Sequence, residues 1–139
     1  MGSTTSTTAF ALTAFIAWSL FLLVLMEGLR TRWVLTKQIQ SNEFRPDNSN
    51  LTPFMQRLAR AHANCVEGLP IFGGLLLVAL VTGNQPVTDS LALVFLGARI
   101  AQSVIHMASM SVMAVNLRFT AFVVQMGIAV SWAVRLLAG

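Results

Sequence analysis

Charged residues are scarce in this chain. Only 10% of its 139 residues are charged and 55% are hydrophobic, whereas an average soluble domain carries about 25% charged residues. This shortage excludes an ordinary soluble domain and indicates an integral membrane protein. No long polar segment is present from which a second domain could be built, so we expect residues 1–139 to form a single membrane domain.

Cysteine is almost absent too. Cys65 is the only cysteine, so no disulfide can form within the chain. Because small and apolar residues surround it in the sequence, we expect it to be a packing thiol rather than a reactive one. No metal site is expected. The net charge of +4 does not indicate a nucleic-acid partner, because the basic residues are interspersed with apolar runs and form no separate basic domain.

Long apolar stretches are abundant. Four of them can form membrane spans, at about 9–29, 53–82, 88–113 and 118–137. Each can reach the roughly 20 residues needed to cross the hydrocarbon core, and helices are the only plausible form because their backbone hydrogen bonds are satisfied internally. We therefore predict an all-α, four-helix integral membrane bundle. Thr52 and Pro53 are a suitable N-cap and first residue for the second helix.

The N-terminal segment predicts a retained first span. The first basic residue is Arg30, so the apolar run before it lacks the basic start of a signal peptide. The first six residues match a myristoylation pattern around Gly2. A span follows at once, so an acyl chain would add little, and we do not expect one.

The basic residues favour one orientation in the membrane. Two of the three predicted loops carry or adjoin them, the first with Arg30, Arg32, Lys37 and Arg45 and the third with Arg118. The positive-inside rule then places loops 1 and 3 in the cytoplasm and both termini outside. The glycosylation sequon that begins at Asn50 would be cytosolic and unused. We expect a bacterial inner membrane, with an endoplasmic-reticulum-type membrane as the alternative.

A polar stripe marks the start of the second span. Its members are Arg57, Arg60, Asn64 and Glu67. Their spacings of three, four and three residues place them within an arc of about 80° on one helical face. The chain turns apolar immediately afterwards. Charged groups that enter hydrocarbon are costly and are tolerated where they face a polar cavity, so the stripe predicts a site.

Other polar residues are expected at the same cytoplasmic half. The third span carries Arg99, Gln102, Ser103 and His106 on one face, the first span ends with Glu27 and Arg30, and the fourth begins with Arg118. Guanidinium groups bind carboxylates and Glu67 could take an ammonium, so a small ligand with both groups would fit. Neighbouring subunits would close the pocket. In the alternative, Arg60 or Arg99 simply neutralises Glu67 and no ligand binds.

At these residues the chain resembles the MAPEG family, membrane-associated proteins of eicosanoid and glutathione metabolism. The matching motif is Arg57-x-x-Arg60-Ala61-His62-x-Asn64-x-x-Glu67-x-x-Pro70, reinforced by Arg30, Ala98-Arg99 and Arg118. The resemblance covers essentially the whole chain. It implies a homotrimer of four-helix subunits, with glutathione in a cytosol-facing pocket between adjacent subunits. A lipophilic small-molecule co-substrate would enter from the lipid bilayer.

The resemblance also implies roles for individual residues. Arg118 would be catalytic and stabilise the glutathione thiolate. The glutathione-binding set would comprise Arg30, Arg57, Arg60, His62, Asn64, Glu67, Arg99, Gln102 and His106. By helical periodicity His62 falls on a different face from the stripe, so packing or a neighbouring subunit's site is its alternative role.

One departure from the family is the complete absence of tyrosine. Family members usually carry tyrosines on the third helix that contact glutathione, and His106 and Gln102 occupy the polar positions there. The resemblance implies a membrane-bound glutathione-dependent transferase or peroxidase acting on lipophilic electrophiles. The missing tyrosines leave a non-catalytic binding or structural protein of the same fold as the alternative. A transporter is disfavoured because the polar groups cluster in one leaflet.

Overall fold

The computed structural model describes residues 6–139, so Gly2, the predicted acceptor of the myristoylation pattern, lies outside the described residues. Within that range the chain forms four helices long and apolar enough to span a membrane, and no strand. They are α1 (Thr7–Leu35), α2 (Pro53–Gly68) continuing through η1 (Leu69–Gly73) into α3 (Gly74–Val81), α4 (Gln85–Ala108) and α5 (Val112–Ala138). The predicted all-α bundle with four membrane helices is confirmed.

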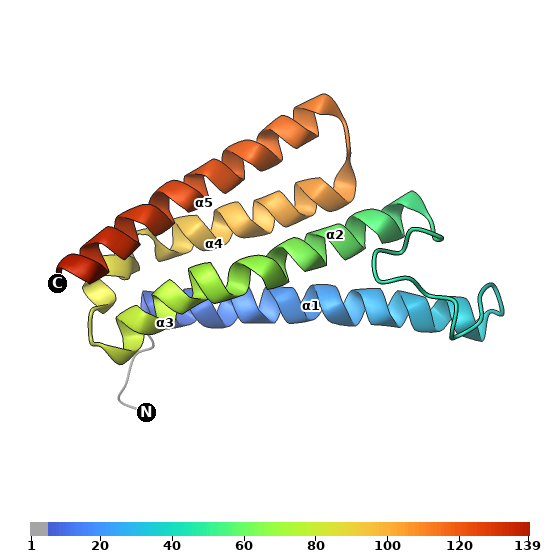
Figure 1. Ribbon diagram of the computed structural model, residues 1–139, viewed down its shortest axis with the longest axis horizontal. Helices are drawn as coiled ribbons and strands as arrows, with labels where there is room; N and C mark the ends of the chain where they lie inside the picture. The colour runs from blue at the N-terminus through green and yellow to red at the C-terminus, as the bar shows by residue number, and fades with distance from the viewer. Residues whose placement is uncertain (1–5) are drawn as a thin grey trace.

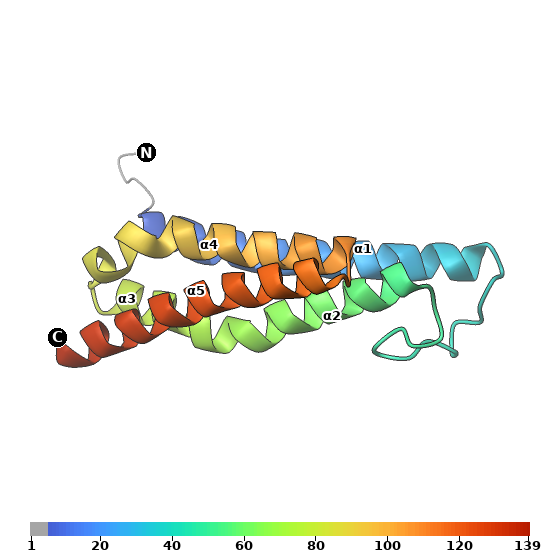
Figure 2. The same ribbon diagram turned by 90° about the horizontal axis from the view of Figure 1, so that it is seen from above.

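The helices run roughly side by side in an elongated bundle (Figure 1). The loop between α1 and α2 and the short link between α4 and α5 lie toward one end (Figures 1 and 2). The C-terminus and the turn between α3 and α4 lie at the other end. Helix α5 packs mainly along α4 and diverges from α2 toward the loop end (Figure 1). This divergence opens one side of the bundle.

Side-chain caps set the starts of three helices. The hydroxyl oxygen of Ser6 accepts from the backbone N–H of Ala9 at 3.0 Å, and that of Thr52 accepts from Met55 at 3.3 Å. Thr52 therefore caps α2 with Pro53 in its first turn, as the sequence predicts. Ser111 caps α5 through the N–H of Ala114 at 3.1 Å.

The boundary between the last two spans differs from the prediction. Helix α4 ends at Ala108 instead of 113, and α5 begins at Val112 instead of 118. Ser109 is extended, with φ −159° and ψ 151°, and Ser111 provides the cap for the next helix. Apolar residues such as Met110 and Met113 continue the hydrophobic run through this link, so hydropathy alone does not reveal the break.

The second span contains a π-helical turn at Pro70. Proline has no backbone N–H and its ring clashes with the preceding turn of a helix. Here the backbone widens locally into η1 and then continues as α3. Gly68 lies just before this turn, where a Cβ atom would be 3.1 Å from Cδ2 of Phe72 and 3.0 Å from Nη2 of Arg99. The turn therefore lies next to the polar part of the bundle.

Aromatic side chains form the centre of the apolar core. Phe95 on α4 contacts Phe15, Phe72 and Trp132, with ring centroids 5.6, 5.2 and 5.8 Å apart. The four rings come from α1, η1, α4 and α5, so all spans meet here. Large apolar side chains such as Val24 and Phe119 are exposed on the outer faces, which suits contact with lipid or with another subunit.

Candidate functional site

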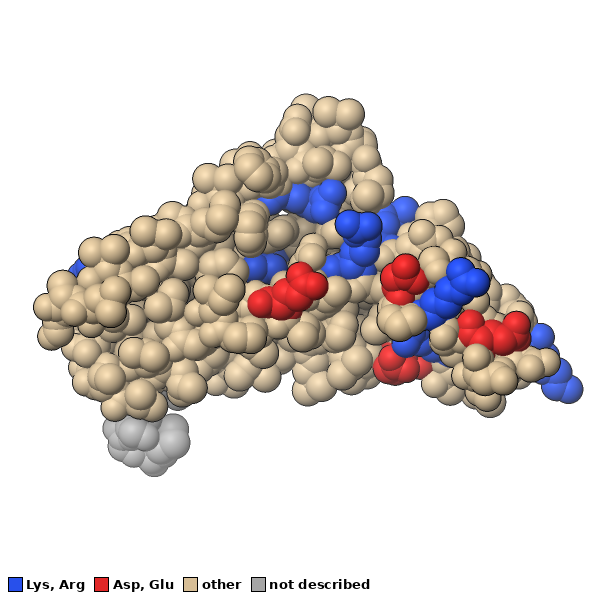
Figure 3. Space-filling model, in the orientation of Figure 1, with Lys and Arg blue, Asp and Glu red and all other residues tan. Residues whose placement is uncertain are grey.

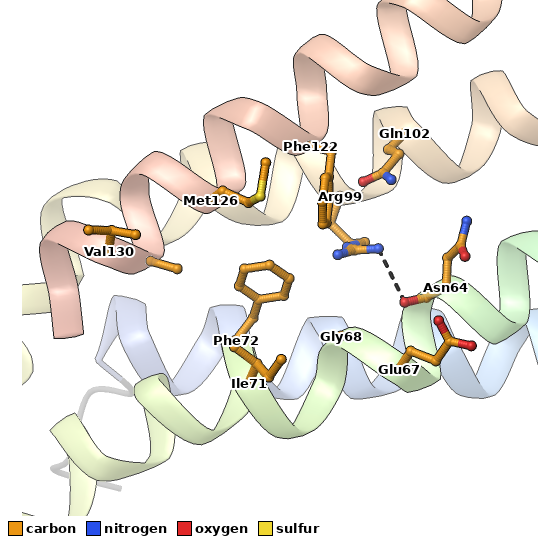
Figure 4. A pocket seen from close by; sticks show the side chains of 11 residues that line it. Asn64, Glu67, Gly68, Ile71, Phe72, Arg99, Gln102, Phe122, Met126 and Val130 are labelled. Carbon is orange, nitrogen blue, oxygen red and sulfur yellow. Dashed lines mark hydrogen bonds between the residues drawn. The ribbon is translucent and has the colours of Figure 1, made fainter.

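A cavity of about 610 Å³ lies between α2 with η1, α4 and α5, on the side that the divergence of α5 opens (Figure 4). Its lining residues come from three spans and are Asn64, Glu67, Gly68, Ile71, Phe72, Arg99, Gln102, Phe122, Met126, Ala129 and Val130. In the space-filling view, basic groups surround a hollow on this face of the molecule (Figure 3).

The cavity is polar at one end and apolar at the other. Asn64, Glu67, Arg99 and Gln102 gather toward the end where α5 leans away, whereas Met126 and Val130 lie toward the C-terminal end of α5 (Figure 4). The positions from Phe122 to Val130 lie eight residues apart on α5, or about 12 Å along a helix axis. Such a cavity suits an amphipathic occupant, or a polar and an apolar ligand bound together.

Arg99 is the most deeply buried charged group of the site, with a side chain only 1% exposed. Its Nη1 atom donates to the carbonyl oxygen of Asn64 at a long 3.4 Å, and its Nε atom has no partner in residues 6–139. The guanidinium lies over the rings of Phe72 and Phe15, 5.4 and 5.7 Å from their centroids. A buried charge is costly without partners. Because Nε makes no hydrogen bond in residues 6–139 and Nη1 makes only a long one, this guanidinium can still bind an anion.

Glu67 is exposed at the cavity and is not neutralised by Arg60 or Arg99. In residues 6–139 the single ion pair joins Arg30 to Glu27 at 3.1 Å. The interpretation of the stripe as a set of mutually neutralising counter-ions therefore has no support in the described contacts. Glu67 remains available to a cationic group.

His106 lies at the junction of the polar groups. Its Nδ1 atom is 3.4 Å from Nδ2 of Asn64, and Arg57, Arg60 and Arg118 are all close enough to it for electrostatic interaction. The Nε2 atom of His106 is buried and lacks a partner in the described range. The structure therefore brings together polar residues from the beginnings of two spans and the end of a third.

Arg57 and Arg118 occupy the rim of this cluster. Nε of Arg57 donates to the carbonyl oxygen of Met107 at 2.8 Å and so joins α2 to the end of α4. Arg118 lines a second cavity of about 200 Å³ together with Gln102 and Phe122. Because Gln102 and Phe122 line both cavities, Arg118 lies next to the main cavity. Its Nε atom is buried without a partner in residues 6–139.

Arg30 and His62 lie away from the main cavity. Nε and Nη2 of Arg30 donate to Oδ1 of Asn48 at 3.0 and 2.6 Å. Its guanidinium lies 5.4 Å from the ring centroid of Phe44, in the first loop. His62 lies on this α1 side, within electrostatic range of Glu27 and Arg30, as its helical position requires. These two residues therefore do not line the cavity.

Two further polar contacts concern residues of α4. Gln125 on α5 is fully buried and its Nε2 atom donates to Oε1 of Gln102 at 2.8 Å. It was not among the residues predicted from the sequence, although a glutamine seven residues after Arg118 in a largely apolar stretch was the available signal.

Cys65 is also fully buried, with its Sγ atom 3.3 Å from Oγ of Ser103, an environment that matches a packing thiol.

Fold and site together describe a polytopic membrane protein with an amphipathic cavity between its helices. A family model matches residues 8–138, and it is that of the MAPEG family. The chain belongs to the MAPEG family, a family of membrane bundles connected with glutathione and eicosanoid metabolism. No curated protein and no solved structure matches the chain.

Proposed function

We propose that this protein is a membrane-bound, glutathione-dependent transferase or peroxidase that acts on lipophilic electrophiles. The observation that carries the proposal is the cavity between α2, α4 and α5. It joins an end with a buried guanidinium, a carboxylate and two amides to a wall of apolar side chains. Membership of the MAPEG family supports a connection with glutathione.

The polar groups fit glutathione, which carries two carboxylates, an ammonium and a thiol. Arg99 keeps a guanidinium nitrogen without a partner in residues 6–139, and Arg60 is exposed nearby; both suit carboxylates. Glu67 suits the ammonium. Asn64, which lies between Arg60 and Glu67 along α2, supplies an amide. Guanidinium groups exceed carboxylates here, which matches a ligand with net negative charge.

Arg118 is the proposed catalytic residue. When bound, glutathione supplies the nucleophilic sulfur of the reaction. A free thiol has a pKa of about 8.5 and is mostly protonated at neutral pH, while a neighbouring cation lowers that pKa and favours the thiolate. The buried, unpartnered Nε atom of Arg118 beside Gln102 suits this role. His106, with its buried Nε2 atom, supplies a further polar contact.

The apolar wall would bind the lipophilic substrate. Ile71 and Phe72 on η1 face Phe122, Met126 and Val130 on α5 across the cavity. These side chains have no polar group that could recognise a particular functional group. They select for apolar character and exclude water from the polar end, which strengthens the electrostatic interactions there.

Assembly as a homotrimer would complete the site. Arg30 and His62 do not line the cavity of their own chain, so in an assembly they could serve a neighbouring copy. The proposed setting is a bacterial inner membrane with the first and third loops in the cytoplasm. The polar end of the cavity then opens toward the cytosol, where glutathione is found.

The competing proposal is a binding or structural protein without catalysis. It is favoured by the lack of any tyrosine, since no phenol is available to contact the cofactor. Turnover of a model electrophile by the purified protein with glutathione separates the two proposals. Measurable turnover that saturates with glutathione supports the enzyme. Saturable glutathione binding without turnover of either an electrophilic aromatic compound or a lipid hydroperoxide supports the binding protein.

A further inference from the structure

Two glutamine side chains from different spans meet beside the proposed thiolate site. Gln125 on α5 is fully buried and Gln102 on α4 is 9% exposed. The Nε2 atom of Gln125 donates both to Oε1 of Gln102, at 2.8 Å, and to the backbone carbonyl oxygen of Ala121, at 3.1 Å. The contact links the helix that carries Arg118 to the helix that carries Arg99.

The direction of these hydrogen bonds is fixed by the backbone. A carbonyl oxygen can only accept, so the Ala121 carbonyl requires the amide nitrogen of Gln125 on its side. That nitrogen has two hydrogens, and the second one is donated to the amide oxygen of Gln102, which must therefore face Gln125. The NH₂ group of Gln102 is thereby turned away from Gln125, and it donates no hydrogen bond within residues 6–139.

The free end of Gln102 lies where the ligand is expected. Gln102 lines both the main cavity and the smaller one that contains Arg118. An NH₂ group held there presents hydrogen-bond donors next to a guanidinium. Both groups suit an acceptor that carries negative charge.

Gln125 is a costly residue for the fold alone. Its Oε1 atom is buried without a partner in the described range, and such an amide oxygen loses its hydration without a replacement. A leucine of similar volume would avoid that cost. The contact with Gln102 gives a functional reason for an amide at this position.

We propose that Gln125 is a positioning residue that holds Gln102 with its NH₂ group toward the glutathione sulfur, so that Gln102 and Arg118 together stabilise the thiolate. This inference rests on the proposed function. Gln125 itself touches neither ligand nor substrate, and acts through the orientation that it imposes on Gln102.

The test is an ultraviolet titration of thiolate absorbance for glutathione bound to wild type, Gln125→Leu, Gln102→Leu and the double variant. We expect Gln125→Leu to raise the midpoint by about one pH unit, a tenfold loss of thiolate, because a hydrogen bond to a charged atom is lost. Its thermal midpoint should change little, because the variant removes the unpartnered Oε1 atom of Gln125 but leaves Oε1 of Gln102 without its donor. The double variant should match Gln102→Leu, since Gln125 acts only through Gln102.

The outcomes separate this inference from the function on which it rests. If wild type shows no thiolate signal, the proposed function fails and takes the inference with it. If wild type shows the signal and Gln125→Leu has the same midpoint, or the two single effects add in the double variant, the inference alone is overturned. Gln125→Met, unbranched and similar in length, replaces the leucine variant if that one does not fold. Thr88→Val, another buried polar substitution, is the control and should titrate as wild type.

Discussion

Arg99 lies so close to Gly68 that a Cβ atom at position 68 would be 3.0 Å from its Nη2 atom. The guanidinium fills the space that a side chain would otherwise occupy, between the ring of Phe72 and the backbone of α2. Residue 68 therefore controls where the buried cation of the cavity lies. The site therefore needs a residue without a side chain at position 68, so that the guanidinium has room.

Replacing Gly68 by alanine should weaken glutathione binding without unfolding the protein. Alanine favours a helix over glycine by about 1 kcal/mol, but the added methyl group must displace Arg99 or the Phe72 ring. We expect about a tenfold higher Kd for glutathione, measured by calorimetry in detergent. Gly74→Ala is the matched control, because a Cβ atom there meets nothing within 4 Å. Equal binding by both variants would show that the position of Arg99 does not matter.

Replacing Glu67 by glutamine should remove the partner of the ligand's ammonium. We expect KM for glutathione to rise about tenfold with kcat little changed, since a charge-assisted hydrogen bond to the ground state is lost. The control is a glutathione analogue that lacks the amine. Wild type and Glu67→Gln should bind this analogue with similar affinity, and a large remaining difference would place Glu67 in another role.

Asp89, near the start of α4, should stabilise the end of the bundle where α1 begins. It should not affect the glutathione site at the other end. Its Oδ1 atom accepts from the backbone N–H of Thr8 at 2.9 Å and also from the Thr8 hydroxyl, so it caps the first turn of α1. Asp89→Ala should lower the free energy of unfolding by about 1 kcal/mol, the usual worth of a cap. Thermal unfolding measures this loss. Glutathione affinity of the folded protein should stay at the wild-type value, and a parallel fall in affinity would contradict the separation of the two ends.

The proposed orientation predicts that Asn50 is never glycosylated. In a secretory-membrane expression system a cytosolic sequon cannot meet the luminal transferase, so the protein should run at the same size with and without glycosidase. A sequon added beyond the C-terminal Gly139 is the positive control, because that terminus is expected outside. Glycosylation at Asn50 would show that the orientation is the opposite of the proposed one. The polar end of the cavity would then face away from the cytosol.

The helical bundle was predictable because hydropathy and caps report on local interactions. Apolar runs of membrane length specify helices, and Thr52 with Pro53 marks the start of α2 correctly. The link before α5 was misplaced because Met110 and Met113 continue the apolar run through the break. The π-helical turn at Pro70 was also missed, since the sequence alone does not say whether a proline breaks, kinks or widens a helix.

Much of the polar cluster was accessible from spacing alone. Residues three and four apart share a helical face, which is why Asn64, Glu67, Arg99 and Gln102 were expected on two stripes, and in the structure they line one cavity. Spacing could not say which stripe faces which. It therefore gave no sign that Arg30 would bind the first loop, or that Gln125 would reach across from α5 to Gln102.

The proposed stabilisation of the glutathione thiolate by Arg118 can be measured through the ultraviolet difference absorbance of glutathione at neutral pH. The purified wild-type protein in mild detergent should give a saturable thiolate signal as glutathione is added. Arg118→Ala should lose most of that signal while keeping its fold and its oligomeric state. Arg135→Ala, a change near the opposite end of the same helix, should keep it. Absence of the signal in wild type, or an unchanged signal in Arg118→Ala, would contradict the proposed activation of the thiol.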